Sequence, residues 1–338
     1  MNETENKIVG FDFVRAFAIF FVFMGHIFGD KLIIRSLSPG LTMSVLGFIS
    51  AYLLTSKYET FNGAFYVKRF SRIYSSLVVC LFFITLFHLF LSYEVINQHS
   101  IFHYMGLSFF MELFNVANKS SLGSGLWFVT IILLMYLLLP LICILYRHKY
   151  SKAHLIVVIL LCLFFNMIMY GTASSWNVVM SFNIGSYVGM NSNIKTFIQK
   201  SFAFYLSTTL FILILCGLAT SQIIPYEVRN FLLALYPFFA VPLLFKIGDN
   251  LKGGVEKIVI WFSSVSYEVY ILHFYFINKN FSDIFPNINS MYLQFLIALV
   301  IVLPLAHIFS KFAVFISSSI NTYLLHFQAV LKSTDIHT

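Results

Sequence analysis

The stretch that decides the fold is FDFVRAFAIFFVFMGHIFG, residues 11–29. Its length matches the roughly 20 apolar residues that a helix needs to cross a bilayer. It nevertheless carries Asp12 and Arg15 near its start and His26 near its end. Hydrocarbon penalises ionisable groups, so those retained in a membrane helix usually face the interior of a bundle and mark a functional site.

Arg15 and His26 are predicted to share one face of this helix. Their separation of eleven residues is close to three whole turns, or roughly 16 Å along the axis. A purely structural explanation is also open: Arg15 would be an anchor that reaches the headgroups, and His26 a core residue hydrogen-bonded to a carbonyl. The functional alternative is favoured for His26 because it lies deep in the segment, beside Gly25, where a substrate can approach closely.

The composition excludes an ordinary soluble domain. Of 338 residues, 59% are hydrophobic and only 10% are charged, whereas soluble domains have about 25% charged residues. The opening MNETENKIVG lacks the basic region of a secretory signal, so we expect the first helix to remain in the mature chain. The four cysteines fall in apolar runs, which predicts neither disulfides nor a metal site.

Apolar runs predict an all-α, polytopic membrane bundle that forms one domain over residues 1–338. We expect ten spans, near residues 11–29, 39–56, 73–93, 125–146, 154–172, 178–191, 202–222, 229–246, 258–277 and 290–311. The segment from about residue 312 is expected to be a short cytoplasmic tail lying on the membrane or the end of a longer last helix. The count is therefore uncertain by about one span.

The basic residues predict which way the chain crosses the membrane. With both termini in the cytoplasm, fifteen of the 21 Lys and Arg residues fall in inner loops and tails and five in outer loops. This distribution also accounts for the net charge of +8 without nucleic acid as a partner. It places Arg15 towards the cytoplasm and His26 in the outer half of the membrane.

The most basic inner segment is FYVKRFSRIYSS, residues 65–76. Arg69 and Arg72 are three residues apart and share a helical face, with Lys68 adjacent. Inside-positive anchoring explains such residues by itself. The functional alternative is a phosphate site, since forked guanidinium groups suit phosphate geometry.

The longest outer loop, roughly residues 94–124, contains the flexible run NKSSLGSG and an apolar middle that suits either a cap over the bundle or a substrate lid. His99 and His103 have the i, i+4 spacing of two ligands on a helix, but no third ligand follows in motif spacing, so no metal is predicted.

Four separated motifs follow one another in order along the chain. They are FDFVRAFAIFFVFMGH; SAYLLTSKYE followed by FYVKRFSRIYSS; GLWFVTIILLMYLLLPLI; and FNIGSYVGM with SYEVYILHFYFI. Together they resemble the acyltransferase family 3 of membrane proteins over residues 11 to about 277. Ala51 and Ser75 stand where the family usually has Gly and Pro, and Ser44 where many members have an acidic residue.

The resemblance implies a membrane-bound O-acyltransferase of the bacterial cytoplasmic membrane. It would move an acyl group, most often acetyl from cytoplasmic acetyl-CoA, to a hydroxyl of a surface carbohydrate that is free or lipid-linked. His26 and Arg15 are the expected catalytic residues, and Arg69, Arg72 and Lys68 the expected contacts to the CoA phosphates. No metal or nucleic acid is implied, and the remaining contacts are with membrane lipids.

Secondary site candidates come from the third and fourth motifs. They are Trp127, Tyr267, Tyr270, His273 and Glu268, expected to bind the substrate. Aromatic rings suit sugar stacking, although helix packing explains any single ring in a chain with 41 Phe and 19 Tyr. Two alternatives remain open: a transporter or flippase of a lipid-linked sugar, and acylation of a non-carbohydrate acceptor.

Overall fold

The computed structural model describes residues 9–29, 39–123, 125–169, 173–192, 194–277, 281 and 283–334. Within these ranges the chain is helical, without a strand, and confirms the predicted all-α polytopic fold. The ten helices there of 18 or more residues are α1 (Val9–Ile27), α3 (Pro39–Lys57), α4 (Gly63–Phe90), α7 (Trp127–Arg147), α8 (Ser151–Ile168), α9 (Ala173–Asn191), α11 (Phe202–Thr220), α12 (Tyr226–Asp249), α13 (Gly253–His273) and α15 (Met291–Thr334). The short helices are α5 (Gln98–Tyr104), α6 (Ser108–Leu113), α10 (Ile194–Phe197) and the 3-10 helix η2 (Phe274–Phe276).

Eight of the long helices in the described ranges are long and apolar enough to cross a membrane. The protein is therefore an integral membrane protein. The two long helices outside that set, α3 and α9, pack against each other inside the bundle. A Cβ atom on Gly185 of α9 would lie 2.3 Å from the carbonyl oxygen of Phe48 in α3, so this close approach requires glycine. Their lower hydropathy reflects contact with other helices in place of lipid.

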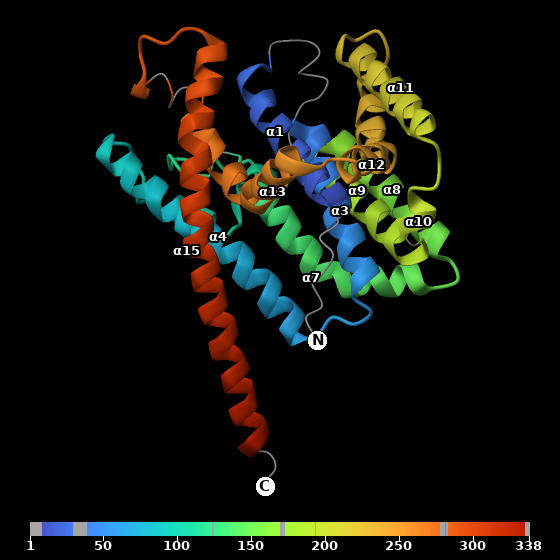
Figure 1. The fold of residues 1–338 in the computed structure, drawn as a ribbon, viewed down its shortest axis with the longest axis horizontal. Coiled ribbons are helices and arrows are strands. Elements are labelled where there is room, and N and C mark those ends of the chain that lie inside the picture. The colour runs from blue at the N-terminus through green and yellow to red at the C-terminus, as the bar shows by residue number, and fades with distance from the viewer. Residues whose placement is uncertain are drawn as a thin grey trace.

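The polar residues of the long helices define two ends of the bundle. We call the arginine end the one where Arg15 of α1 and Arg69 and Arg72 of α4 lie, and the histidine end the one where His26 of α1 and His273 of α13 lie. Helices α1 and α4 both run upwards in Figure 1, away from the arginine end. Helix α13 leads from one end to the other, because its Ser263 bonds to Asp12 of α1 and its His273 meets His26 of α1. A site built on these helices therefore has access to both ends.

Two helices extend further than their predicted spans. Helix α4 begins at Gly63, where the side chain of Asn62 accepts a hydrogen bond from the amide of Phe65 as an N-cap. The basic segment is therefore helical. Helix α15 continues to Thr334, so the segment after residue 311 is the end of a longer last helix, the second of the two expected alternatives. The helix has 44 residues, or roughly 66 Å. Its last part projects beyond the rest of the bundle at the lower end of Figure 1.

Candidate functional site

At the arginine end, Arg15 is held by contacts from its own helix and its neighbour. Asp12 accepts from Arg15 at 3.4 Å, an ion pair between residues three apart on α1. Asp12 also accepts a hydrogen bond from Ser263 of α13 at 2.8 Å. The Arg15 side chain is 41% exposed, and it interacts electrostatically with groups of α4 and α7. It therefore faces α4 and α7 while it remains partly exposed.

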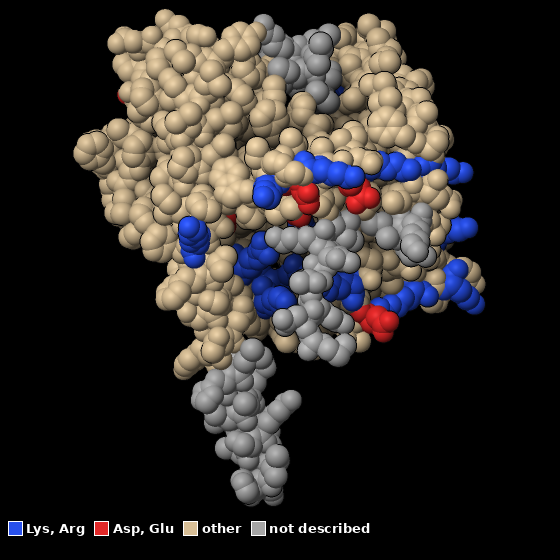
Figure 2. All heavy atoms as spheres, viewed as in Figure 1, with Lys and Arg blue, Asp and Glu red and all other residues tan. Residues whose placement is uncertain are grey.

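The basic residues of α4 lie at the same end. Arg69 and Arg72 both interact electrostatically with Arg15. Arg69 is half-buried, 5.7 Å from the ring of Tyr58, and its Nε atom is buried without a hydrogen-bond partner. Arg72 and Lys68 are exposed. Figure 2 shows Lys and Arg side chains gathered in the lower middle of the molecule, at the arginine end.

This gathering leaves an excess of positive charge. Three guanidinium groups lie near two carboxylates, Asp12 beside Arg15 and the buried Glu268, which interacts with Arg72. Like charges repel at short range, so an anionic ligand here would be stabilised. The donors of Arg69 and Arg72 fit phosphate oxygens in the paired manner that guanidinium groups favour.

Glu268 lies between the two ends and is almost fully buried, with 4% of its surface exposed. Ser76 of α4 donates a hydrogen bond to the Glu268 side chain at 2.6 Å. Glu268 also interacts electrostatically with Arg72. The buried carboxylate thus connects α13 to the basic part of α4.

A row of rings on α13 leads from Glu268 to the histidine end. Tyr267 and Tyr270 stack with centroids 6.5 Å apart, and Tyr270 and His273 are 5.9 Å apart. The hydroxyl of Tyr267 is buried without a hydrogen-bond partner. Because residues three apart share a helical face, the row lines one side of α13. We call Tyr267, Tyr270 and His273 the α13 ring row.

At the histidine end, the imidazoles of His26 and His273 meet with centroids 5.2 Å apart. Phe274 packs on His26 at 5.3 Å. His273 Nδ1 lies 2.6 Å from the carbonyl oxygen of Tyr270, and a carbonyl can only accept, so Nδ1 carries the proton. Its Nε2 is buried without a hydrogen-bond partner. This nitrogen is then free to accept a proton.

The pairing of His26 with His273 was not predicted, because His273 was expected only to bind the substrate. Eleven residues separate Arg15 from His26 within one helix, but 247 positions separate His26 from His273. A histidine in each of two apolar helices is the sequence signal that would have suggested a pair.

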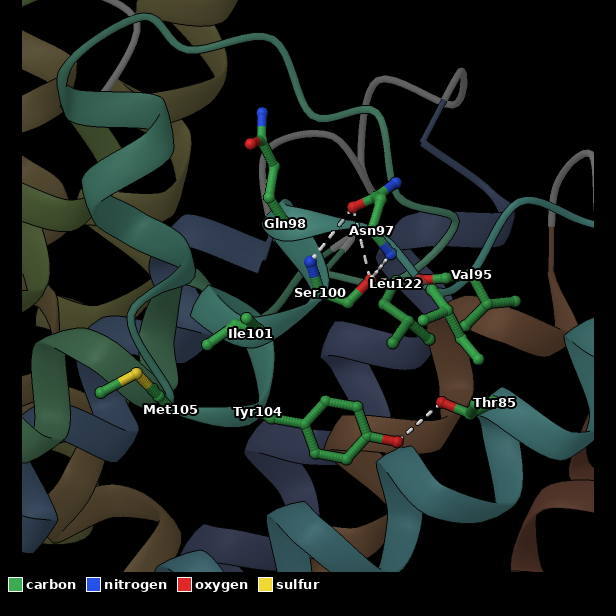
Figure 3. A pocket seen from close by; sticks show the side chains of 10 residues that line it. Thr85, Val95, Asn97, Gln98, Ser100, Ile101, Tyr104, Met105 and Leu122 are labelled. Carbon is green, nitrogen blue, oxygen red and sulfur yellow. Dashed lines mark hydrogen bonds between the residues drawn. The ribbon is translucent and has the colours of Figure 1, made fainter.

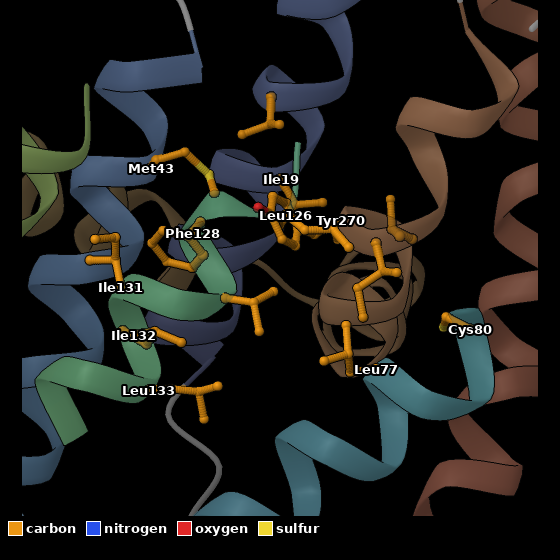
Figure 4. Close-up of a cluster of buried hydrophobic side chains, with 14 of the residues drawn as sticks. Ile19, Met43, Leu77, Cys80, Leu126, Phe128, Ile131, Ile132, Leu133 and Tyr270 are labelled. Atoms are coloured by element: carbon orange, nitrogen blue, oxygen red, sulfur yellow. The ribbon is translucent and has the colours of Figure 1, made fainter. Parts of the chain in front are cut away.

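Trp127 occupies a less direct position. Its indole is half-buried, and its ring contact among the described residues is with Phe128, at 6.1 Å. The chain just before it does reach the site, since Tyr270 donates a hydrogen bond to the carbonyl of Gly125. Figure 4 shows Tyr270 beside Leu126 and Phe128. The structure brings the start of α7 to the ring row, while the indole lies to one side.

Tyr136 of α7 joins the site although it was cited only as part of a motif. Its hydroxyl lies 2.6 Å from Ser50 Oγ of α3, and it interacts electrostatically with both Arg15 and Tyr267. A tyrosine in the middle of an apolar helix is the sequence signal for such a residue, since a buried hydroxyl needs a partner.

A separate groove of about 670 Å³ lies between α4 and α5. Thr85 and Tyr104, whose hydroxyls lie 2.7 Å apart, form part of its lining (Figure 3). None of the predicted site residues lines it. In the described ranges, no three His, Cys, Asp or Glu side chains are grouped as metal ligands.

Comparison with known proteins agrees with the motifs. No curated protein and no solved structure matches the chain. A family model described as an acyltransferase domain matches residues 8–311, nearly the whole chain, including every residue assigned above to the two ends and to the ring row between them. The protein therefore belongs to acyltransferase family 3 and is a membrane-bound acyltransferase.

Proposed function

We propose that the protein transfers an acetyl group from acetyl-CoA to a hydroxyl of a bacterial cell-surface carbohydrate. The observation that supports this best is that α1 presents an arginine within a basic cluster at one end and an imidazole paired with His273 at the other. An anionic donor and a hydroxyl acceptor need different groups for binding, and this arrangement separates the two.

In this proposal the donor enters from the arginine end. The phosphates of acetyl-CoA bind Arg69 and Arg72, with Lys68 at the rim and Arg15 deeper in the bundle. The pantetheine arm then extends along the α13 ring row and carries the thioester towards His26. Arg15 and His26 are roughly 16 Å apart along α1, so the arm has to cover the distance between them.

The chemistry is a single acyl transfer. His26 removes the proton from the acceptor hydroxyl as its oxygen attacks the thioester carbonyl carbon. The C–S bond breaks, the acyl group becomes an ester of the acceptor, and the thiolate of CoA takes the proton from His26. Nearby donors stabilise the negative charge that develops on the carbonyl oxygen. His273 packs against His26 and so fixes the position of its imidazole.

The direction of transfer follows from the distribution of basic residues. Cytoplasmic termini put the arginine end on the side where acetyl-CoA is found and the histidine end towards the cell surface, in the bacterial inner membrane. Lys7, Lys31, Arg35 and Lys279, which contribute to that count, lie outside the described residues. The orientation is testable by labelling single cysteines placed in the loops at each end.

The acceptor is proposed from the rings at the histidine end. Tyr270 offers an apolar face and a polar edge, which suit a sugar ring, and Trp127, to one side of the ring row, is a second proposed contact. Glu268 supplies a buried oxygen that can accept a hydrogen bond. A carbohydrate such as O-antigen, capsule or exopolysaccharide, free or lipid-linked, fits these contacts.

The proposal is tested with purified protein in liposomes, radiolabelled acetyl-CoA and lipid-linked surface oligosaccharide from the source bacterium. We expect labelled ester on the oligosaccharide, released by mild alkali, and none with His26→Ala. Label on a peptide or small alcohol in place of the sugar would show that the acceptor is not a carbohydrate. Movement of unlabelled sugar across the bilayer without ester formation would instead indicate a transporter and contradict the proposal.

A further inference from the structure

Helix α5 carries two histidines that the site described above does not use. His99 and His103 are both buried, the latter with only 2% of its surface exposed. His99 Nδ1 accepts a hydrogen bond from the amide of Lys119 at 3.0 Å. Both imidazoles therefore face the segment NKSSLG, residues 118–123. With Gly125 added, we call this segment the glycine loop.

His103 contacts the glycine loop through Nε2 and one ring face, and α6 through Nδ1. Its Nε2 lies 3.2 Å from Asn118 Oδ1, and its Nδ1 lies 2.9 Å from Ser108 Oγ. Asn118 in turn donates to the carbonyl of Leu122 at 2.7 Å, which fixes the orientation of the amide, so His103 Nε2 is the donor. Burial lowers the pKa of His103, so Nδ1 accepts from the Ser108 hydroxyl.

Gly123 lies directly against the His103 ring. Its φ of +93° is a conformation that favours glycine, and a Cβ atom there would lie 2.0 Å from His103 Cε1. Residues 118–123, part of a run that the sequence suggested to be flexible, are thus in contact with the two histidines of α5.

The glycine loop makes contact with the end of α13. Gly123 donates its amide hydrogen to the hydroxyl of Tyr275 at 3.0 Å. The carbonyl of Gly125 accepts from Tyr270, and a Cβ on Gly125 would lie 3.3 Å from Phe274. These three aromatic residues flank His273 in the chain, and Phe274 also packs on His26.

We propose that His103, through Asn118 and Gly123, is a positioning residue for the acyl transfer, fixing the glycine loop that in turn fixes His273 beside His26. This inference rests on the proposed function. Small displacements of catalytic groups cost up to about a hundredfold in rate, even when the substitution is far from the reacting atoms. A loop that touches both sides of His273 can cause such a displacement.

The test compares His103→Ala with His103→Gln, which keeps a side-chain donor for Asn118. We expect His103→Ala to lower kcat per folded enzyme by about 10- to 100-fold, with the KM for acetyl-CoA unchanged because the donor binds at the other end. His103→Gln should recover most of the loss. His154→Ala is the matched control, because His154 binds one carbonyl, that of Leu145, in another part of the molecule, and its kcat should stay at the wild-type value.

A double-mutant cycle with Tyr270→Phe tests whether the effect passes through the glycine loop. If it does, His103→Ala combined with Tyr270→Phe loses no more activity than the more severe single variant, because both break the same connection. Losses that multiply independently, or an unchanged kcat in His103→Ala, would overturn the inference.

Hydrogen exchange supplies a readout that does not depend on the reaction. His103→Ala should speed exchange in residues 118–125 and also in residues 270–277, whereas faster exchange confined to 118–125 would contradict the positioning role. If the wild-type protein transfers no acyl group, the proposed function fails while this measurement still decides whether His103 controls the end of α13.

Discussion

The two ends of the site differ in exposure to water and in how their charges are balanced. At the arginine end, Arg72 and Lys68 are exposed, and positive charge exceeds that of the nearby carboxylates. At the histidine end, His273 is 1% exposed, His26 is half-buried, and aromatic rings pack against both imidazoles. Exposed charge suits an anion that binds and leaves, whereas a largely buried pair of bases suits proton transfer with limited access for water that would hydrolyse a thioester.

This comparison implies that substitutions at the two ends have separable effects. Loss of a group at the histidine end should lower kcat, because it acts in the transition state. Loss of a group at the arginine end should raise the KM for acetyl-CoA with little effect on kcat, because it contributes to binding. A substitution at one end that produced the phenotype of the other would break the comparison.

The largest effect is expected for His26→Ala. Removal of a general base costs about 10²- to 10⁴-fold in rate, so transfer to the acceptor should fall to background, with acetyl-CoA still bound. The measurement is steady-state kinetics together with binding of a non-hydrolysable acetyl-CoA analogue. His154→Ala again serves as the histidine control. Retention of more than about a tenth of the activity would remove His26 from the chemistry.

Replacement of the α4 arginines by lysine should have an intermediate effect. Arg69→Lys and Arg72→Lys keep the charge and lose the forked donors, so we expect the KM for acetyl-CoA to rise about 10- to 100-fold, as for loss of a hydrogen bond to a charged group. The assay varies acetyl-CoA at saturating acceptor. Lys68→Ala, an exposed neighbour on the same turn, should change KM by less than about threefold. Equal effects for all three would indicate general charge attraction without a phosphate site.

The sequence was sufficient for the parts of the structure that depend on local pattern. Apolar runs predicted the ten long helices, and the spacing of Arg15 and His26 on one helix held because a regular helix fixes that geometry. The expected span for α4 began too late, at residue 73, although its arginines were placed on a helical face, and the segment after residue 311 was left open between a tail and a longer last helix. A hydropathy pattern ends where polar residues begin, but the helices continue, capped by Asn62 in one case and supported by contacts between Ser317 and Ser71 in the other.

Contacts between distant segments could not be predicted in the same way. The meeting of His26 with His273 and the hydrogen bond from Ser76 to Glu268 depend on which helices become neighbours. The glycine loop shows most clearly what the sequence could not predict. Ser and Gly predict flexibility from composition, and only the placement of His99 and His103 against the loop shows how its polar groups are bound.

The smallest expected effect concerns Glu268, which connects the two ends, and its sign differs from that of the arginine variants. Glu268→Gln keeps an oxygen to accept from Ser76 and removes a negative charge that interacts with Arg72. The basic cluster then attracts the anionic donor more strongly, so the KM for acetyl-CoA should fall, by about threefold at low salt and less at high salt. In an Arg72→Gln background this decrease should be smaller, because the two charges interact. A large fall in kcat with unchanged KM would instead place Glu268 in the chemistry at the histidine end and remove the division of labour between the two ends.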